Sequence, residues 1–351
     1  MRAADSVAMP QTPTATSRPT TTREIRLAAR PVGEPTPADF ELAVADLPPL
    51  APGQILVRNT WMSVEPYMRG RMDEGESYIP AFELGAPLDG GAVGEVVESR
   101  ADGVPVGATV VHFLGWRDHA VADAAAVTVV DPDVAPAQAH LGVLGTPGLT
   151  AWLALTETAP VRPGDVVWVS SAAGAVGSVA GQFARQQGAA HVIGSAGGPE
   201  KVARLADLGY DTGLDHKADP LDKQLAQAAP DGIDVYVDAV GGDHLHAAID
   251  ALRVGGRVAA IGAIGGYNAT APVPGPTNLY EVAKKQLTVR GLLVTDHLHR
   301  FPEYHATVGP WLADGTVRHV ETVVDGLDQA PAALIGLLRG AGVGKMLVRL
   351  G

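Results

Sequence analysis

The sequence has 351 residues, of which 46% are hydrophobic, and its formal net charge is −13 at pH 7. This length suffices for two domains with a large core, and the acidic balance argues against nucleic acid or an anionic membrane as a partner. The sequence contains no cysteine, which excludes disulfide bonds and thiolate zinc sites. No apolar run reaches the about 18 residues of a membrane span, and the N-terminus lacks the apolar core of a signal peptide, so we expect a cytoplasmic protein.

The N-terminal third of the chain has the pattern of short strands. Residues 1–22 are rich in Thr, Ser, Pro and Ala, and we predict a flexible tail there. Residues 62–72 are expected to form a polar and aromatic loop between strands. The region after the tail is therefore predicted to be a β-rich, barrel-like domain. Its predicted strands are 24–27, 40–44, 54–59, 90–98 and 108–113.

Strands and helices alternate beyond residue 144, which predicts an α/β domain with a doubly wound parallel sheet. The C-terminal strands are expected to rejoin the β-rich domain. The domains are thus predicted as a dinucleotide-binding domain at 146–311 and a β-rich substrate domain at 23–145 and 312–351. The predicted strands of the second half are 166–170, 190–194, 233–238, 257–262, 287–293, 317–320 and 345–350, and the predicted helices include 200–209, 244–253 and 277–285.

A glycine turn lies between the strand at 166–170 and a helical segment at 179–185. Its spacing is Ser171-x-x-Gly174-x-x-Gly177, so the first glycine of the usual G-x-G-x-x-G motif is absent. Gly174 would let the backbone approach a pyrophosphate, and Gly177 would let the helix pack close to the strand. The start of that helix offers free N–H groups to phosphates. The strand–turn–helix context therefore favours dinucleotide binding over an ordinary turn of small residues.

The end of the next strand favours NADP over NAD. An acid that holds the ribose 2'-hydroxyl of NAD usually stands about 20 residues after the glycines. Here the sequence is Gly194-Ser195-Ala196-Gly197-Gly198, with Lys201 and Arg204 in the following helix. Small residues leave room for a 2'-phosphate, and a cation can bind it.

The motifs, taken together, resemble one family. The chain resembles the zinc-free branch of the medium-chain dehydrogenase/reductase family, which includes prostaglandin reductases, leukotriene B4 dehydrogenases and plant double-bond reductases. The resemblance implies a Rossmann domain and a GroES-like β-rich domain. The matching segments are 64–72, 144–152, 172–178, 200–201, 262–268 and 344–345.

The resemblance implies NADPH-dependent reduction of the carbon–carbon double bond of α,β-unsaturated aldehydes or ketones by a homodimer. It implies that the glycine turn contacts the pyrophosphate and that Lys201 contacts the 2'-phosphate. It also implies that residues 262–267 and 292–294 line the nicotinamide side. The implied cofactor residues are Thr150, Gly174, Ala175, Val176, Gly177, Ser195, Lys201, His216, Gly262, Ala263, Ile264, Tyr267, Leu292, Leu293 and Val294.

Three positions depart from the family pattern. His216 stands where a tyrosine is common near the 2'-phosphate, and Ala239 and Gly342 stand where the family commonly has asparagine. The two replaced amides concern the affinity for the cofactor and leave the class unchanged.

Tyr267 and Tyr67 are the candidate catalytic residues. Tyr267 follows a strand end and two glycines, at the edge of the sheet where doubly wound folds bind ligands. Tyr67 either packs in a core or faces the substrate, and Tyr78 could cover the substrate. Tyr267 would hold the enolate oxygen that develops during reduction.

Two other functions stay open from the sequence. A quinone oxidoreductase has the same fold and cofactor, and a protein that binds NADPH without turnover belongs to another class. The sequence has no pair of histidines with a matching carboxylate, so we expect no catalytic metal site. His244 and His246 are expected on the surface. The sequence also has no G-x-S-x-G motif, so we expect no serine nucleophile.

Overall fold

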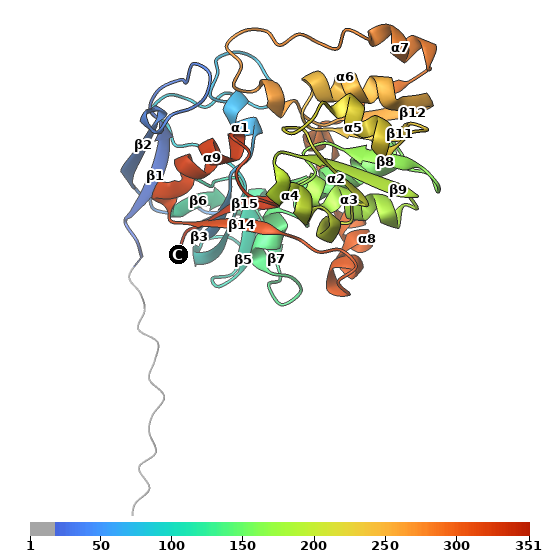
Figure 1. Ribbon diagram of the computed structural model, residues 1–351. Helices are drawn as coiled ribbons and strands as arrows, with labels where there is room; N and C mark the ends of the chain where they lie inside the picture. The colour runs from blue at the N-terminus through green and yellow to red at the C-terminus, as the bar shows by residue number, and fades with distance from the viewer. Residues whose placement is uncertain (1–17) are drawn as a thin grey trace, which may run out of the picture.

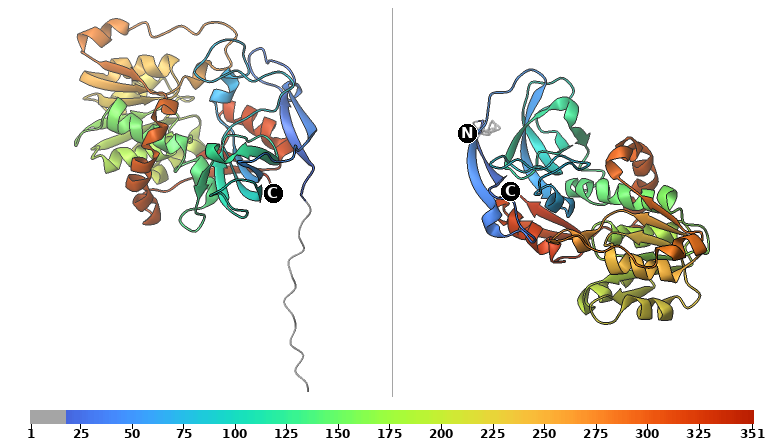
Figure 2. Two further views of the ribbon diagram at one scale, coloured as in Figure 1. Left: turned by 180° about the vertical axis from the view of Figure 1, so that it is seen from behind. Right: turned by 90° about the horizontal axis from the view of Figure 1, so that it is seen from above.

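The computed structural model describes residues 18–351, which form two lobes that are best separated when seen from above (Figure 2). One lobe is built on a six-stranded parallel sheet and the other on a seven-stranded sheet with a separate β-hairpin. Figure 1 shows the parallel sheet with its helices beside the β-rich lobe, to which the last strand of the chain returns. The predicted α/β class is confirmed, and the predicted tail at 1–22 lies largely outside the described residues.

The parallel sheet has the strand order β10-β9-β8-β11-β12-β13. Its order reverses between β8 and β11, because the chain adds β9 and β10 on one side of β8 before it crosses to the other. Such a reversal leaves a crevice at the carboxyl ends of the strands. The bounds are β8 Val166–Val169, β9 His191–Ala196, β10 Thr212–Asp215, β11 Ile233–Asp238, β12 Leu252–Ala260 and β13 Thr288–Gly291.

Helices cover both faces of this sheet, so its central strands are apolar on both sides, as buried parallel strands are. One face packs Val167, Val169 and Val237 against α2 (Thr146–Leu153), α3 (Gly177–Gln186) and α8 (Phe301–Ala313). The other face packs Trp168, Tyr236 and Val258 against α5 (Leu221–Ala228) and α6 (Gly242–Ala251). Two short helices, α4 (Pro199–Arg204) and α7 (Leu279–Lys284), follow β9 and precede β13.

The β-rich lobe contains a sheet with the order β14-β15-β3-β4-β5-β7, and β6 pairs with β3 in addition. Its strands are β3 Gln54–Ser63, β4 Ala92–Ser99, β5 Thr109–His112, β6 His119–Asp123, β7 Thr128–Val130, β14 Glu321–Asp325 and β15 Lys345–Arg349. Strands β1 (Thr21–Leu27) and β2 (Phe40–Asp46) form the antiparallel hairpin. The lobe also contains the helices α1 (Tyr67–Gly70) and α9 (Ala330–Leu338). The C-terminal segment therefore joins the sheet of the N-terminal part, between β14 and β3.

The structure corrects several predicted elements. Residues 317–320 are not a strand: Val317 is buried and its amide donates to the carbonyl of Trp311, and β14 begins later. The helix predicted at 244–253 ends at Ala251, since Leu252 begins β12. The predicted loop at 62–72 contains the one-turn helix α1. Strands β6, β7 and β10 were not predicted, because each is short and partly polar.

Two consecutive residues, Gly344 and Lys345, link the two lobes. The amide of Gly344 donates to the carbonyl of Ala173 in the glycine turn, at 2.7 Å. The ammonium group of Lys345 is buried and donates to the hydroxyl of Ser63, to the carbonyl of Val64 at 3.2 Å and to the carboxylate of Glu65 at 3.2 Å. Burial lowers the pKa of Lys345, and the carboxylate of Glu65 opposes that shift. The end of β3 and the glycine turn are thus fixed to adjacent residues of the same segment.

Lys345→Met should lower the free energy of unfolding by about 3 kcal/mol, because it leaves the largely buried carboxylate of Glu65 without its cation. Chemical denaturation of the variant and the parent protein measures this difference. Lys223→Met, at an exposed lysine of α5, is the control and should change stability by less than about 0.5 kcal/mol. Adding Glu65→Gln to Lys345→Met should recover part of the loss, and equal losses in single and double variants would contradict the pairing.

Candidate active site

The glycine turn after β8 presents unpaired backbone donors at the start of α3. Among residues 18–351, the amides of Ala175, Val176 and Gly177 donate to no acceptor, whereas the amides of the residues on both sides are paired. Three free amides at a helix N-terminus attract an anion. The turn lies at the reversal of strand order, so the structure places the predicted glycine motif at the crevice of the sheet.

Gly177 and Ser171 show how this turn is packed. A Cβ atom on Gly177 would lie 2.4 Å from the carbonyl oxygen of Ser171 and 2.6 Å from the Cα atom of Ala172, which leaves room for glycine alone. Ser171 has a φ of 49°, in the left-handed region that glycine prefers. Ser171 directly precedes Ala172, which stands where the usual motif has its first glycine, and the left-handed backbone of Ser171 costs roughly 1 kcal/mol.

A second turn, between β9 and α4, carries the residues predicted for the 2'-phosphate. Lys201 of α4 donates from its ammonium group to the carbonyl of Gly340, and burial lowers its pKa, as does the nearby Lys217. His216 follows β10, and burial together with Lys217 lowers its pKa below the ordinary value of 6.5. Ser195 is fully buried in β9 and its hydroxyl has no partner. Lys201, His216 and Lys217 therefore surround one turn.

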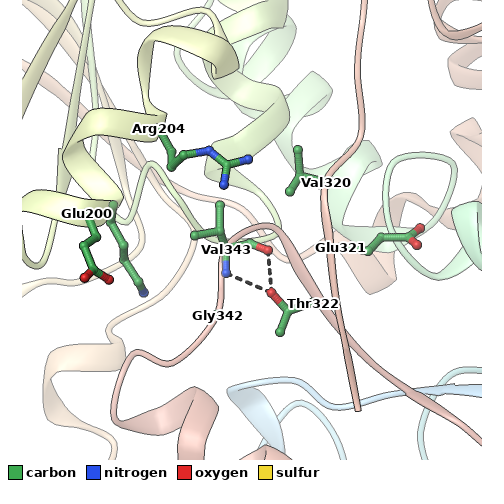
Figure 3. A pocket seen from close by; sticks show the side chains of 8 residues that line it. Glu200, Arg204, Val320, Glu321, Thr322, Gly342 and Val343 are labelled. Carbon is green, nitrogen blue, oxygen red and sulfur yellow. Dashed lines mark hydrogen bonds between the residues drawn. The ribbon is translucent and has the colours of Figure 1, made fainter. Parts of the chain in front are cut away.

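A pocket of about 570 Å³ opens between α4 and the segments 320–322 and 342–343 (Figure 3). It is lined by Lys201 and Arg204 on the helix side and by Gly342 on the other. The hydroxyl of Thr322 donates to the carbonyl of Val343 at 2.8 Å and accepts from its amide at 3.0 Å, as the dashed lines in Figure 3 show. A Cβ atom on Gly342 would lie 2.9 Å from this hydroxyl, and the φ of Gly342 is 79°. Thr322 therefore occupies the space that a side chain at position 342 would need.

The residues after β12 form a third part of the site. The phenol oxygen of Tyr267 accepts from the amide of Ala263 at 3.4 Å and lies 3.4 Å from where a Cβ atom on Gly262 would be. The amide of Leu292 donates to the carbonyl of Ala260, which places 292–294 beside this loop. The carboxylate of Asp238 accepts from the amides of Val240 and Gly241 at the end of β11 and so holds the neighbouring turn.

Three tyrosines from different segments meet near this loop. The phenol oxygen of Tyr67 is buried without a partner, and burial raises its pKa well above the usual range, helped by the carboxylate of Glu65. Tyr78 is 55% exposed, and burial of part of its ring together with Tyr267 raises its pKa. Tyr78 also raises the pKa of Tyr67 slightly, so each of these phenols lies within electrostatic range of the next along the series Tyr67, Tyr78 and Tyr267.

Two further predicted residues have local roles in the structure. The hydroxyl of Thr150 donates to the carbonyl of Thr146 within α2, at 2.8 Å. His244 is buried, not on the surface as the sequence predicted, because it starts α6 over the face of Trp168, with ring centroids 6.0 Å apart. Burial lowers the pKa of His244 to about 4, and its ring contacts His216 edge-on at 5.1 Å.

The structure also bears on metal binding and membranes within its described range. Over residues 18–351, no group of three or more His, Asp or Glu side chains is arranged to hold a metal ion. In the same range, the helices are too short or too polar to cross a bilayer.

Comparisons with known proteins identify the family. Residues 23–130 match the family described as "N-terminal domain of oxidoreductase", and residues 175–309 match the family described as "Zinc-binding dehydrogenase". The chain is 36% identical to the NADPH-dependent curcumin reductase of Escherichia coli, over 92% of this chain and 95% of that protein. It is 37% identical to prostaglandin reductase 1 of Rattus norvegicus, over 90% and 95%.

The solved structure of CurA from Vibrio vulnificus in complex with NADPH superposes with a TM-score of 0.89 at 37% identity, covering 94% of this chain and 99% of that one. The chain therefore belongs to the medium-chain dehydrogenase/reductase family, in its zinc-free branch with the prostaglandin reductases. The family inferred from the motifs is thereby confirmed.

Sequence reasoning missed Lys217, Thr322 and Glu65 as parts of the site. Lys217 follows His216 directly, and its charge next to the predicted phosphate position was a usable signal. Thr322 and Glu65 come close to the site through contacts across more than 20 residues, and no local pattern marks them.

Proposed function

We propose that this protein reduces the carbon–carbon double bond of α,β-unsaturated aldehydes or ketones with NADPH. The observation that supports it most directly is that Tyr267, in the loop after β12, and the turn with three free amides, after β8, both follow the carboxyl ends of strands of one parallel sheet. Tyr267 offers a phenol donor to a substrate carbonyl, and the free amides of the glycine turn offer donors to a dinucleotide. The curcumin and prostaglandin reductases named above are relatives over nearly the whole chain.

The chain's own groups fit NADPH. The free amides of Ala175, Val176 and Gly177 suit the pyrophosphate, since they would otherwise stay unpaired at a helix start. Lys201 and His216 suit the 2'-phosphate, because no carboxylate ends β9 where an NAD-binding unit would have one. Gly262, Ala263 and Ile264, together with Leu292–Val294, suit the nicotinamide side, where glycine leaves the backbone open.

Bound NADPH would supply the hydride that the β-carbon of the substrate accepts, and the α-carbon of the resulting enolate would take a proton from solvent. Tyr267 then has the central role among the protein's residues: its phenol donates a hydrogen bond to the substrate carbonyl, whose oxygen gains negative charge as it becomes an enolate. Because the phenol is held beside Ala263 before the substrate arrives, little reorganisation is needed when the charge develops.

Tyr67 is the second candidate donor. Its raised pKa keeps the phenol protonated at neutral pH, and its oxygen has no partner in the protein. An unpaired buried hydroxyl costs free energy that a substrate oxygen would recover. The buried pair of Lys345 and Glu65 holds the start of the segment that carries Tyr67, and so fixes this phenol relative to the glycine turn.

A substrate panel tests the function. NADPH oxidation should be fast with an alkenal and an enone and slow with quinones, and product analysis should show a saturated carbonyl compound. Faster turnover of quinones would instead support a quinone oxidoreductase. Tight NADPH binding without turnover of any panel member would support a binding protein.

Tyr267→Phe should lower turnover of an enone about ten- to a hundredfold at saturating NADPH, because it removes one donor to the enolate oxygen while the ribose hydroxyl of the cofactor partly replaces it. The Michaelis constant for the enone should change less than turnover does. Steady-state kinetics measure both. Tyr280→Phe is the matched control, since Tyr280 lies on α7 and is 76% exposed. Unchanged turnover in Tyr267→Phe, with NADPH binding intact, would assign Tyr267 to packing.

NADPH should bind more weakly as pH rises from about 6.5 to 8.5, because an imidazole with a phosphate beside it takes up a proton on binding. In the free protein, burial, Lys217 and Lys201 lower the pKa of His216 below 6.5, and Asp215 opposes this shift. The neighbouring His244 is buried and stays neutral over this pH range. The phosphate raises this pKa, so binding is strongest where His216 is already protonated and weakest above the pKa of the complex.

Calorimetric titrations across this pH range measure the effect, with His216→Gln and NADH as controls. His216→Gln should flatten the pH dependence for NADPH, and NADH should show none. A dependence for NADPH that is equal in His216→Gln and the parent protein would remove His216 from the phosphate site.

We also propose a homodimer formed through the parallel sheet. Strand β13 is an edge of this sheet, all four of its residues are exposed, and Val289 is 47% exposed. An open edge strand has unpaired backbone groups that are suited to pair with a second copy.

A further inference from the structure

Two side chains lean over the turn between β9 and α4. A Cβ atom on Gly197 would lie 2.9 Å from the Cε atom of Lys217 and 3.0 Å from the Cε1 atom of His216. The stem of Lys217 and the ring of His216 thus cover the same point of the turn. Glycine at position 197 lets both side chains approach the backbone of the turn closely.

The backbone beneath Lys217 is fixed to this turn. One carboxylate oxygen of Asp215 accepts from the amide of Gly198 at 2.8 Å and from the amide of Lys217 at 3.0 Å. These two amide donors lower the pKa of Asp215. The carboxylate is therefore engaged with the backbone of both loops and holds them together.

The ammonium group of Lys217 has no hydrogen bond or ion pair with any group in the part of the chain that the structure describes. Other exposed lysines differ: Lys223 pairs with Asp219 at 3.3 Å, and Lys284 pairs with Glu281 at 2.6 Å. Lys217 lowers the pKa values of Lys201 and His216, and of Asp215, without a side-chain hydrogen bond to any of them.

The cations around the turn repel one another. Lys217 lowers the pKa of Lys201, second to burial, and no carboxylate acts on Lys201 in return. Lys217 and Lys201 both lower the pKa of His216, whereas Asp215 raises it. Two ammonium groups and an imidazole from α4 and from the residues after β10 therefore lie within electrostatic range of one another, with the carboxylate of Asp215 among them. Three bases beside one carboxylate favour an anion of more than one charge between them.

We infer that Lys217 is a phosphate ligand and determines, together with Lys201, the preference of this protein for NADPH over NADH. The inference rests on the proposed function, in which the 2'-phosphate lies at this turn. A phosphomonoester carries close to two charges at neutral pH and several acceptor oxygens, so it can pair with both lysines and His216 at once. Lys217 is thereby a specificity-determining residue, and it takes no part in the reduction itself.

Lys217→Gln should raise the NADPH dissociation constant about five- to tenfold, because it removes a charge-assisted contact at a partly exposed site. The dissociation constant for NADH should stay within about twofold. The same comparison with 2',5'-ADP and 5'-AMP, which carry the adenosine part of the two cofactors, should show the same selective loss.

Two further variants make the test specific. Lys217→Arg keeps the charge and should retain most of the NADPH affinity, whereas Lys223→Gln, six residues further along the chain, should not affect either cofactor. Equal weakening of NADPH and NADH by Lys217→Gln, or no weakening of NADPH, would overturn the inference. If the parent protein bound NADH as tightly as NADPH, the proposed cofactor would be wrong. Titration of the parent protein alone measures this, so that outcome is distinguished from a failure of the inference on Lys217.

Discussion

One backbone hydrogen bond, from the amide of Gly344 to the carbonyl of Ala173, determines how the two halves of the site meet. Gly344 has a φ of 74°, and a Cβ atom there would lie 1.8 Å from the carbonyl oxygen of Val320, so the crossing can be made by glycine alone. The next residue, Lys345, binds the end of β3 and Glu65. The segment that carries Tyr67 and the turn with the free amides are therefore positioned by two adjacent residues.

The electrostatics of the site differ from those of the molecule as a whole. The chain is strongly acidic, yet Lys201, His216 and Lys217 gather at one turn, and Asp215 is occupied by backbone amides. In the proposed function, repulsion among these bases is relieved when the 2'-phosphate of NADPH binds between them. The arrangement would thus favour a phosphorylated ligand over an unphosphorylated one.

The sequence predicted what is local and missed what is not. The strand, turn and helix at 166–186 follow from a continuous apolar run and from glycines at fixed spacing, and the structure shows them in that order. The burial of His244 could not be predicted, because it depends on Trp168 of a strand more than 70 residues earlier. The meeting of Tyr67, Tyr78 and Tyr267 depends on how two sheets are joined, which no short pattern encodes. From the sequence, Gly342 is interpreted only as the replacement of a family asparagine. The structure shows that the hydroxyl of Thr322 fills the space that a side chain at position 342 would need.

The place of β15 in the β-rich sheet has a consequence for synthesis. Strand β3 pairs with β15 at Trp61–Ser63, and β15 consists of residues near the end of the chain. During translation that edge of β3 stays without its partner until residues 345–349 have left the ribosome, and an unpaired edge can pair with other nascent chains. The β-rich sheet is therefore completed only after the intervening parallel sheet has been synthesised.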